Sequence, residues 1–370
     1  MVFDAIVIGV GSMGAATCYQ LAKRGQRVLG LEQFGIVHDE GSHTGQSRII
    51  RKAYFEHPDY VPLLESAYAG WQTLEEESGT QLYWPVGLAY FGEPGNPVLV
   101  EAQSSAQAYQ LPLERKPPSY FPSFQLPTDW ECWLEPEAGY LSPELAIRAF
   151  AQMAQHHGAE IRTQQRVMDL EVAGTEVVVR TEQEEFKARK LVITAGAFIK
   201  DLVNLSVPLQ VTRQYLAWTE TDPFGTPEAP CWVIAEPGTP GIYYGFPQTE
   251  HLPGPRGMKF GHHRPGDEWI PHLPDGIPAE TKVLNGVLDR YFHRDLTIGE
   301  WATCKYTYSE DEHFILDFLP EYNQQVIVAT GFSGHGFKFV PVIGEILADL
   351  VQKESTEHPA GFLGLGRFSR

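Results

Sequence analysis

The sequence predicts an α/β protein in which a parallel-sheet domain is interleaved with a second, mixed-sheet domain. A strand, a glycine-rich turn, a helix and a second strand follow one another over residues 3–32. The stretches 82–138 and 209–308 are aromatic and punctuated by proline, which is typical of sheet strands joined by loops. Buried-strand composition returns at 158–194 and 325–330. The first domain is therefore predicted to be assembled from separate stretches of chain.

The N-terminal unit has the pattern of a Rossmann-like fold. Residues 3–8 are mostly apolar and end in β-branched side chains, as expected for a central parallel strand. Gly9-Val10-Gly11-Ser12-Met13-Gly14 follows directly, residues 15–25 have a helical pattern, and residues 27–32 form a second apolar run ending in an acid. This order of elements predicts a parallel sheet that binds a dinucleotide.

Each glycine of the turn has a physical role in such a site. The first allows a tight turn, the second lets the backbone approach a pyrophosphate, and the third lets the helix pack against the strand. The helix N-terminus adds amide donors, and the acid that ends the second strand can accept hydrogen bonds from a ribose. The predicted cofactor-binding residues of this unit are Gly9, Gly11, Ser12, Met13, Gly14 and Glu32.

Helix-start signals and apolar runs predict the rest of the first domain. A Gly-, His- and Ser-rich loop covers 35–47 and precedes a helical pattern over 59–77, for which Asp59 is the predicted N-cap. Ser142-Pro143-Glu144 combines an N-cap residue, a proline at the first position and an acid in the first turn, and it opens a helix that reaches about His157. Strands are predicted at 158–167, 176–180, 191–194 and 325–330, and a last helix at 339–352.

Composition narrows the class of function. The chain has 28 Lys+Arg against 47 Asp+Glu, a formal net charge of −19, which argues against nucleic acid or an anionic membrane surface as a partner. The four cysteines are far apart and form no CxxC, so neither a metal site nor a disulfide framework is expected. The N-terminus has no basic region before its apolar run, and no apolar stretch approaches ~20 residues. We therefore expect a cytoplasmic protein.

The dinucleotide motif by itself leaves NAD and FAD open. Its position at the extreme N-terminus and a second strand ending in Thr194-Ala195-Gly196 favour FAD. The predicted division is a discontinuous FAD-binding domain and a substrate domain. The FAD-binding domain comprises residues 1–82, 141–210 and 315–370, and the substrate domain comprises residues 83–140 and 211–314.

Five further motifs resemble the monomeric sarcosine oxidase family, which includes N-methyltryptophan oxidase and pipecolate oxidase. They are Gly41-Ser42-His43-Thr44-Gly45-Gln46-Ser47-Arg48-Ile49-Ile50-Arg51, Tyr243-Tyr244-Gly245-Phe246-Pro247, Lys259-Phe260-Gly261-His262-His263, Cys304-Lys305-Tyr306-Thr307, and Gly331-Phe332-Ser333-Gly334-His335-Gly336-Phe337-Lys338-Phe339. The resemblance covers essentially the whole chain. It implies an amine oxidase whose FAD is joined through its 8α-methyl group to a cysteine.

One position departs from the family pattern and bears on the substrate. The sarcosine and methyltryptophan enzymes tend to have two adjacent histidines where this chain has His43-Thr44. The run from Gly45 to Tyr54 looks closer to the pipecolate oxidase branch. L-Pipecolate oxidase is therefore kept as an alternative to a sarcosine-type enzyme.

The resemblance implies that Cys304 carries the flavin as a thioether, although a free cysteine judged on residue type alone is more often a buried hydrophobe. It also implies that Arg48 and Lys338 lie at the cofactor. The remaining cofactor-binding residues predicted with them are Ser42, His43, Ser47, Val167, Ala195, Gly196, Gly334, His335 and Gly336.

The substrate and oxygen sites are predicted from convergent cations. Arg51 and Lys338 are expected to bind the substrate carboxylate, because an arginine fork grips it in two places and a lysine adds a point charge. By resemblance, Lys259 activates oxygen and Arg48 contacts the flavin ring, since a fixed cation in a dry site stabilises negative charge where it develops. Tyr244, His263 and Tyr306 are expected to line the pocket, which would favour the neutral amine by desolvation.

The predicted reaction is oxidation of the C–N bond of a secondary or N-methyl amino acid to an imine, with O2 reduced to H2O2. The partners are then a small amino acid and O2, and the family name suggests a monomer. Three alternatives stay open: a flavin dehydrogenase that passes electrons to a non-oxygen acceptor, an NAD-dependent dehydrogenase, and a non-catalytic nucleotide-binding module. Lys259 argues against the first, and the four cations argue against the last.

Overall fold

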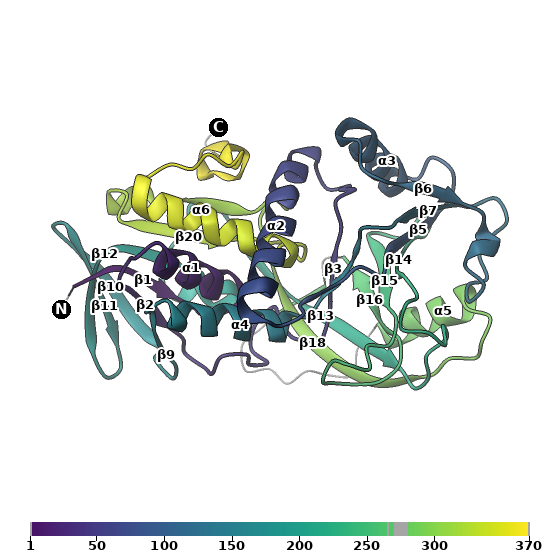
Figure 1. Cartoon of the computed structure of the whole chain (residues 1–370), viewed down its shortest axis with the longest axis horizontal. Coiled ribbons are helices and arrows are strands. Elements are labelled where there is room, and N and C mark those ends of the chain that lie inside the picture. Colours follow the sequence, from purple (N-terminus) through teal and green to yellow (C-terminus); the bar gives the residue numbers. More distant parts are fainter. Residues whose placement is uncertain (1, 265, 270–279, 369–370) are drawn as a thin grey trace.

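A computed structural model of the chain describes residues 2–264, 266–269 and 280–368. The two sheets lie at opposite ends of an elongated molecule, and α2 (Val61–Ser78) lies between them (Figure 1). Met1, residues 265 and 270–279, and residues 369–370, which fall within the predicted domain ranges, are outside the described residues. No helix in the described part of the chain is both long and apolar enough to cross a membrane.

The first sheet has a parallel centre with antiparallel additions. Five strands run parallel in the order β20-β12-β1-β2-β9. The β10–β11 hairpin pairs antiparallel with the first half of β12, and β19 pairs antiparallel with β20. Its strands are β1 (Val2–Ile8), β2 (Val28–Leu31), β9 (Glu160–Arg162), β10 (Val167–Ala173), β11 (Glu176–Thr181), β12 (Glu185–Ile193), β19 (Ile315–Phe318) and β20 (Val326–Thr330). The parallel sheet expected from the N-terminal unit is confirmed.

Strand alternation gives this sheet two buried faces. Ala5 and Val7 of β1 face a core shared with the helices α1 (Ser12–Lys23), α4 (Pro143–His156) and α6 (Val340–Lys353). Ile6 and Ile8 face the opposite core, which contains side chains of the β10–β11 hairpin. Because both faces are covered at the centre of the sheet, β2 and β20 are buried at every position, whereas β9, β10 and β12 carry polar side chains that are partly exposed.

The second sheet is mixed and belongs to the aromatic, proline-punctuated stretches. Its strands are β5 (Leu88–Gly92), β6 (Glu114–Lys116), β7 (Glu131–Glu135), β13 (Gln210–Thr219), β14 (Cys231–Ala235), β15 (Ile242–Phe246), β16 (Lys259–His263), β17 (Asp267–Glu268) and β18 (Ile298–Tyr308). All its pairings are antiparallel except the one between β14 and β5. A small sheet of β3 (Arg48–Ile50), β8 (Gly139–Leu141) and β4 (Tyr83–Trp84) completes the strands.

Two helices lie within stretches that were predicted as strands and loops, and this part of the prediction is wrong. In α3 (Pro97–Tyr109), Asn96 caps the first turn by accepting from the Val98 amide at 3.0 Å, and Leu99, Ala102 and Ala106 are buried on one face. In α5 (Thr281–Tyr291), the buried residues Leu284, Val287, Leu288 and Tyr291 recur at helical spacing. The surrounding aromatic residues obscured both patterns.

Two predicted boundaries also differ from the structure, whereas the predicted start of α4 is confirmed. The second helix begins at Val61, because Pro58–Tyr60 form a 3-10 turn in which the His57 ring accepts from the Asp59 amide, so Asp59 is not the N-cap. Ser142 occupies the N-cap position of α4 but makes no side-chain capping bond. The run 158–167 is not one strand, since β9 ends at Arg162 and Val167 begins the antiparallel β10.

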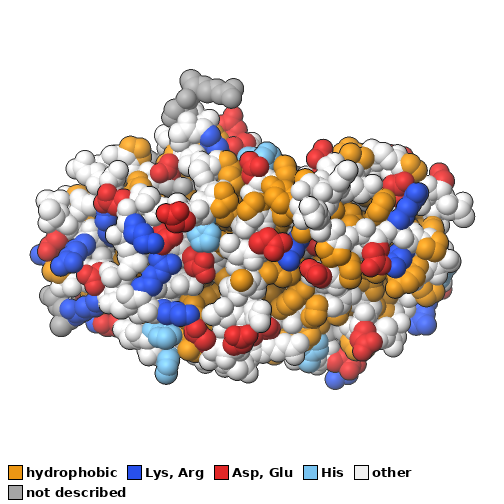
Figure 2. Space-filling model, turned by 45° about the horizontal axis from the view of Figure 1, so that its top comes forward, with side chains coloured by type: hydrophobic (Ala, Val, Ile, Leu, Met, Phe, Trp, Pro, Cys, Tyr) orange, Lys and Arg blue, Asp and Glu red, His pale blue; other side chains and the backbone are white. Residues whose placement is uncertain are grey.

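Most lysine and arginine side chains at the surface form ion pairs with nearby aspartate or glutamate side chains. On the face seen in Figure 2, lysine and arginine side chains lie beside acidic ones, and hydrophobic side chains gather across the middle. Arg180 pairs with Asp169, Glu171 and Glu185. The buried cations described below are a different population, because Lys259, Arg51 and Lys338 are only 1%, 4% and 6% exposed.

Candidate functional site

A cavity opens at the carboxyl ends of the parallel strands. Gly9 follows β1, Glu32 follows β2, Ala195 lies just after β12, and Gly331 follows β20. Ligands of doubly wound sheets bind at this edge. The predicted cofactor residues that line the cavity are Gly9, Gly11, Ser12, Met13, Glu32, Ser42, His43, Arg48, Val167, Ala195, Gly196, Gly334 and Gly336. Tyr306, which was predicted to be catalytic, lines it as well.

Two glycines of the turn at the floor of the cavity, Gly9 and Gly14, leave no room for a side chain. Gly9 has φ +87°, and a Cβ on it would lie 2.7 Å from the Thr194 carbonyl oxygen. A Cβ on Gly14 would lie 1.9 Å from the Gly9 carbonyl oxygen, so the start of α1 packs directly on the turn. The turn therefore presents backbone and the N-terminus of α1 to the cavity, which suits a pyrophosphate.

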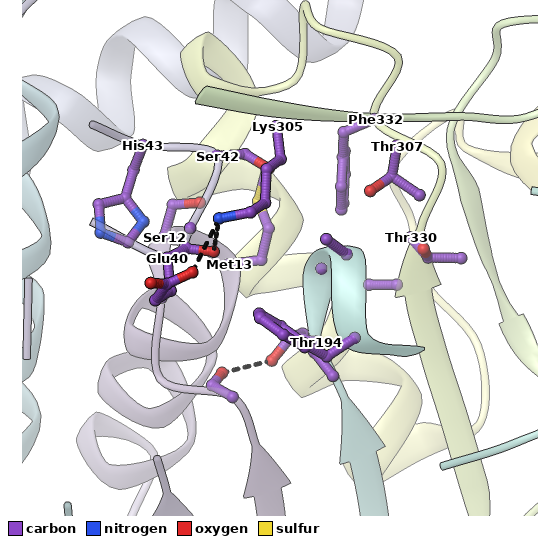
Figure 3. A pocket seen from close by; sticks show the side chains of 18 of the residues that line it. Ser12, Met13, Glu40, Ser42, His43, Thr194, Lys305, Thr307, Thr330 and Phe332 are labelled. Carbon is purple, nitrogen blue, oxygen red and sulfur yellow. Dashed lines mark hydrogen bonds and ion pairs between the residues drawn. The ribbon is translucent and has the colours of Figure 1, made fainter. Parts of the chain in front are cut away.

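Three buried polar atoms on the cavity wall have no hydrogen-bond partner among the described residues. They are Nε2 of His43 and the hydroxyl oxygens of Thr307 and Thr330, and all three side chains are drawn around the cavity in Figure 3. Buried polar groups normally have partners, so these three fit a polar ligand. Burial lowers the pKa of His43 to about 3, assisted by the charges of His38 and Arg48, so its ring is neutral at pH 7. The cradle and these groups together fit a bound dinucleotide.

Glu32 also fastens the glycine turn. Its Oε2 accepts from the Val10 amide at 2.8 Å, and its Oε1 accepts from the Phe34 amide at 2.9 Å. The carboxylate thus ties the end of β2 to the turn after β1. The predicted ribose contact would use the remaining acceptor capacity of these two oxygens.

The cavity is lined by an ion pair, drawn in Figure 3, that was not predicted from the sequence. Lys305 Nζ lies 3.0 Å from Glu40 Oε2 and donates to the Glu40 carbonyl oxygen at the same distance. Glu40 belongs to the predicted loop 35–47 and Lys305 to β18, so the pair joins the loop to the second sheet.

Lys259 lies under the loop that contains Ser47. Its Nζ donates to the Ser47 carbonyl oxygen at 2.7 Å and lies 3.4 Å from the Ser47 hydroxyl. It also lies 4.6 Å from the centre of the Phe246 ring. The pKa of Lys259 is well below its usual value, because burial and the charge of Arg48 disfavour the ammonium.

Cys304 is one of four free cysteines, all buried. It lies on β18 and is not among the residues that line the cavity, although its neighbours Lys305 and Tyr306 are. Burial raises its pKa, while the charges of Arg48, Lys259 and Lys305 oppose that rise. These three cations favour the thiolate, which is the reactive form of a cysteine.

Arg51 is buried and forms an ion pair with a partly buried residue that was not predicted. Its Nη2 lies 2.5 Å from Oε2 of Glu56, and its Nη1 donates to the Ala53 carbonyl oxygen at 2.9 Å. The guanidinium also lies 4.4 Å from the centre of the Tyr54 ring. Burial would raise the pKa of Glu56, but the charges of Arg51, His335 and Lys338 lower it to about 2.

Lys338 belongs to the same cluster. Its Nζ donates to the His335 carbonyl oxygen at 2.9 Å. Burial and the charge of Arg51 lower its pKa to about 7, against a smaller opposing effect of Glu56. The His335 ring accepts from the Tyr54 hydroxyl, with 2.5 Å between the two atoms, and its Nε2 donates to the Glu312 carbonyl oxygen. Neither His335 nor Lys338 lines the cavity described above.

The predicted pocket residues lie near this cluster. The His263 and Tyr306 rings are 5.7 Å apart, and the Tyr244 hydroxyl lies within 2.9 Å of where a Cβ on Gly261 would stand. Burial lowers the pKa of His263 to about 4, and the charges of Lys338 and Arg51 act in the same direction. The ring is therefore neutral at pH 7, as expected for a pocket that favours a neutral amine.

Sequence reasoning missed Glu56, Thr307, Thr330 and the Lys305–Glu40 pair. Glu56 follows Arg51 by five residues, so an acid of opposite charge was visible nearby. Thr307 and Lys305 both line the cavity, and they lie two residues apart on one strand, so alternation would have placed them on one face. Thr330 offered no such signal, because it reads as the last residue of a buried strand.

Comparison with known proteins identifies the family. The family described as "DAO: FAD dependent oxidoreductase" matches residues 4–350. A monomeric sarcosine oxidase of Bacillus sp. (strain B-0618) is 35% identical over 99% of this chain and 96% of that protein. An N-methyl-L-tryptophan oxidase of Yersinia pestis (strain Pestoides F) is 33% identical over the full length of both. These full-length relatives do not favour the pipecolate oxidase alternative.

Solved structures agree with the fold. NikD, an unusual amino acid oxidase essential for nikkomycin biosynthesis, superposes in its open form with a TM-score of 0.86 and 26% identity, over 98% of this chain and 97% of that one. The L-proline dehydrogenase of P. horikoshii has a TM-score of 0.83 at 21% identity, over 100% and 98% of the two chains, and shows the fold alone. The chain therefore belongs to the FAD-dependent oxidoreductase family and, within it, to the monomeric sarcosine oxidase group.

Proposed function

We propose that the protein is an FAD-dependent oxidase of secondary or N-methyl amino acids of the sarcosine type. The observation that carries this proposal is the pair of buried cations Arg51 and Lys338. Arg51 forms an ion pair with Glu56, while Lys338 donates, among the described residues, only to the His335 carbonyl oxygen. Such a cluster has capacity for a second carboxylate, which an amino acid would supply. The full-length similarity to sarcosine and N-methyltryptophan oxidases supports the same substrate class.

The overall reaction balances with oxygen as the acceptor. An amine and O2 give an imine and H2O2, and water then splits the imine, so that sarcosine would yield glycine and formaldehyde. Bound FAD supplies the two-electron chemistry that links the two halves. The residues proposed to hold it are those of the glycine turn, the lining residues named above, and Arg48, with His335 and Lys338 close to the ring.

The remaining roles follow from position and charge. Arg51 and Lys338 bind and orient the carboxylate. Tyr244, His263 and Tyr306 exclude water and favour the neutral amine, because a desolvated site disfavours the ammonium. Lys259 supplies positive charge beside the reacting oxygen, where negative charge develops. Cys304 attaches the cofactor covalently; burial raises the pKa of its thiol, and the charges of Arg48, Lys259 and Lys305 limit that rise.

The proposed division of labour keeps the predicted domains: 1–82, 141–210 and 315–370 bind FAD, and 83–140 and 211–314 bind substrate. The two sheets support this division, because the strands of the parallel sheet and those of the mixed sheet fall in different ranges. We also infer a monomer in the cytoplasm, which is supported by relatives named as monomeric and by the four free, buried cysteines.

The test is oxygen uptake by the purified yellow protein with sarcosine, N-methyl-L-tryptophan and L-pipecolate. We expect uptake with a sarcosine-type substrate, stoichiometric H2O2, and slower turnover of L-pipecolate. The Lys259→Met variant should still be bleached by substrate without air but should react slowly with oxygen. Bleaching of the unchanged protein without oxygen uptake would instead indicate a dehydrogenase. No bleaching by any of the three would refute the substrate class.

A further inference from the structure

The loop from Ser42 to Ser47 turns its carbonyl groups towards two cations. Arg48 donates to the carbonyl oxygens of Ser42 at 2.9 Å, Thr44 at 2.6 Å and Ser47 at 2.9 Å. Lys259 donates to the same Ser47 oxygen at 2.7 Å. The position of the Lys259 ammonium is therefore set by the conformation of this loop.

Two amides of the loop donate to one carboxylate. Oε1 of Glu144 accepts from the Gly45 amide at 3.0 Å and from the Gln46 amide at 2.9 Å. Gly45 and Gln46 have φ +100° and +73°, a conformation that non-glycine residues rarely adopt. The Gln46 side chain is held as well, because its Oε1 accepts from the Trp218 indole at 3.0 Å. Glu144 thus braces the strained turn that precedes Ser47.

The same carboxylate acts on the charge of Lys259. The titratable groups around the ammonium come from four elements: Arg48 on β3, Glu144 on α4, Cys304 on β18 and Cys231 on β14. Burial and Arg48 lower the pKa of Lys259, whereas Glu144, Cys304 and Cys231 raise it. The aromatic rings of Phe246 and Trp218 complete the surroundings. Of these groups, Arg48 and Glu144 also bind the loop that holds the ammonium, and Glu144 is the carboxylate of the two.

We propose that Glu144 is a positioning residue for Lys259, which holds the loop that binds the ammonium and keeps that ammonium protonated for the reaction with oxygen. This inference rests on the proposed oxidase function. Conversion of O2 to H2O2 consumes two electrons and two protons, and a fixed positive charge stabilises the negative charge that develops on oxygen. A neutral Lys259 amine would not supply that charge.

A purely structural role is the competing explanation. Glu144 lies in the first turn of α4, where an acid stabilises the helix. Replacement by alanine removes the loop contacts, the charge and this helix effect together. The Glu144→Gln variant separates them, because its amide oxygen still accepts from both loop amides while the negative charge is gone.

The experiment compares Glu144→Gln and Glu144→Ala with the unchanged holoenzyme. Glu354→Gln is the control for loss of one charge, because Glu354 pairs with Lys190 near the surface. Three quantities are measured for each: bleaching by sarcosine without air, the oxygen reaction of the anaerobically reduced enzyme from pH 6 to 10, and the titration of Lys259 by the 13Cε resonance. The Lys259→Met variant lacks that resonance and so identifies it, and it shows how slow the oxygen reaction becomes when the lysine is absent.

We expect Glu144→Gln to bleach within about twofold of the unchanged enzyme. The rate of its oxygen reaction should fall at a pH about one unit lower than in the unchanged enzyme, so that above this transition the variant reacts about tenfold more slowly. The pH midpoint of the Lys259 resonance should shift by the same amount. Glu144→Ala should show the same shift with a lower melting temperature. Glu354→Gln should match the unchanged enzyme.

Two results would overturn the inference. An unchanged Lys259 titration in Glu144→Gln would show that the charge has no such role. If Glu144→Gln lost bleaching and the oxygen reaction to the same extent, with no shift in the pH at which the oxygen reaction falls, Glu144 would have a structural role only. If the unchanged enzyme takes up no oxygen, the proposed function fails, yet the resonance still reports whether Glu144 controls Lys259.

Discussion

Arg51 and Glu56 form a partly buried ion pair with 2.5 Å between Nη2 and Oε2, inside the pocket proposed to bind an amino acid. Arg51 also donates to the Ala53 carbonyl oxygen, so part of its guanidinium is already engaged before substrate arrives. A substrate carboxylate must share Arg51 with Glu56 or displace Glu56 from it. The pair therefore tunes affinity as well as stability.

The Glu56→Gln variant should be less stable than the parent by about 3 kcal/mol, because breaking a buried pair leaves a charge without compensation. A simple carboxylate such as acetate should restore more stability to the variant than to the parent, since it replaces the lost partner. Thermal unfolding with and without acetate measures both effects. Glu354→Gln, in an exposed pair, should cost less than 1 kcal/mol. Equal melting of Glu56→Gln and the parent would contradict the prediction.

Carboxylate binding should weaken as the pH rises through about 7. The pKa of Lys338 is lowered to about 7, so the ammonium is lost above that pH and with it one of the two cations of the pocket. His263 and His335, with pKa values of about 4 and 3, and Glu56, at about 2, do not titrate in this range. Spectral titration with acetate from pH 6 to 9 should show the dissociation constant rising by up to about tenfold per pH unit above 7. The Lys338→Met variant should show weak binding without this dependence; a similar slope in the variant would assign the titration to another group.

The Cys304→Ala variant should hold its flavin without a covalent bond. After acid precipitation the parent protein should remain yellow, while the variant should release its colour to the supernatant. Cys231→Ala is the matched control, because Cys231 is also buried and lies near Lys259. Flavin that stays attached to Cys304→Ala would refute the assignment of the linkage.

The Gly14→Ala variant should lose both stability and cofactor. Its Cβ would lie 1.9 Å from the Gly9 carbonyl oxygen and 2.7 Å from the Thr194 hydroxyl, so α1 must move away from the turn. We expect the free energy of unfolding to fall by about 2–3 kcal/mol, measured by calorimetry, and the flavin to be released, measured by absorbance. Gly361→Ala, where a Cβ meets nothing within 4 Å, should change neither.

The sequence was informative where local chemistry decides structure. The glycine turn, the strands beside it and helix α4 could be placed because each has a distinctive residue pattern. Partner choice was harder to predict. Glu56 stands only five residues from Arg51, but the amides of Gly45 and Gln46 meet Glu144, which lies 99 and 98 residues further along the chain. That contact depends on where α4 packs against the loop. The missed helix α3 has a clear cap in Asn96, but its neighbours resemble strands.

The cofactor cavity has walls from both extremes of the chain. Its floor follows β1 near residue 9, and its last wall is the turn after β20, at residues 331–337. A nascent chain that has not yet exposed this turn has an open-sided cavity with no place for a ring to settle. We therefore expect the cofactor to bind only after synthesis of most of the chain, and a chain that ends before this turn to lack bound cofactor.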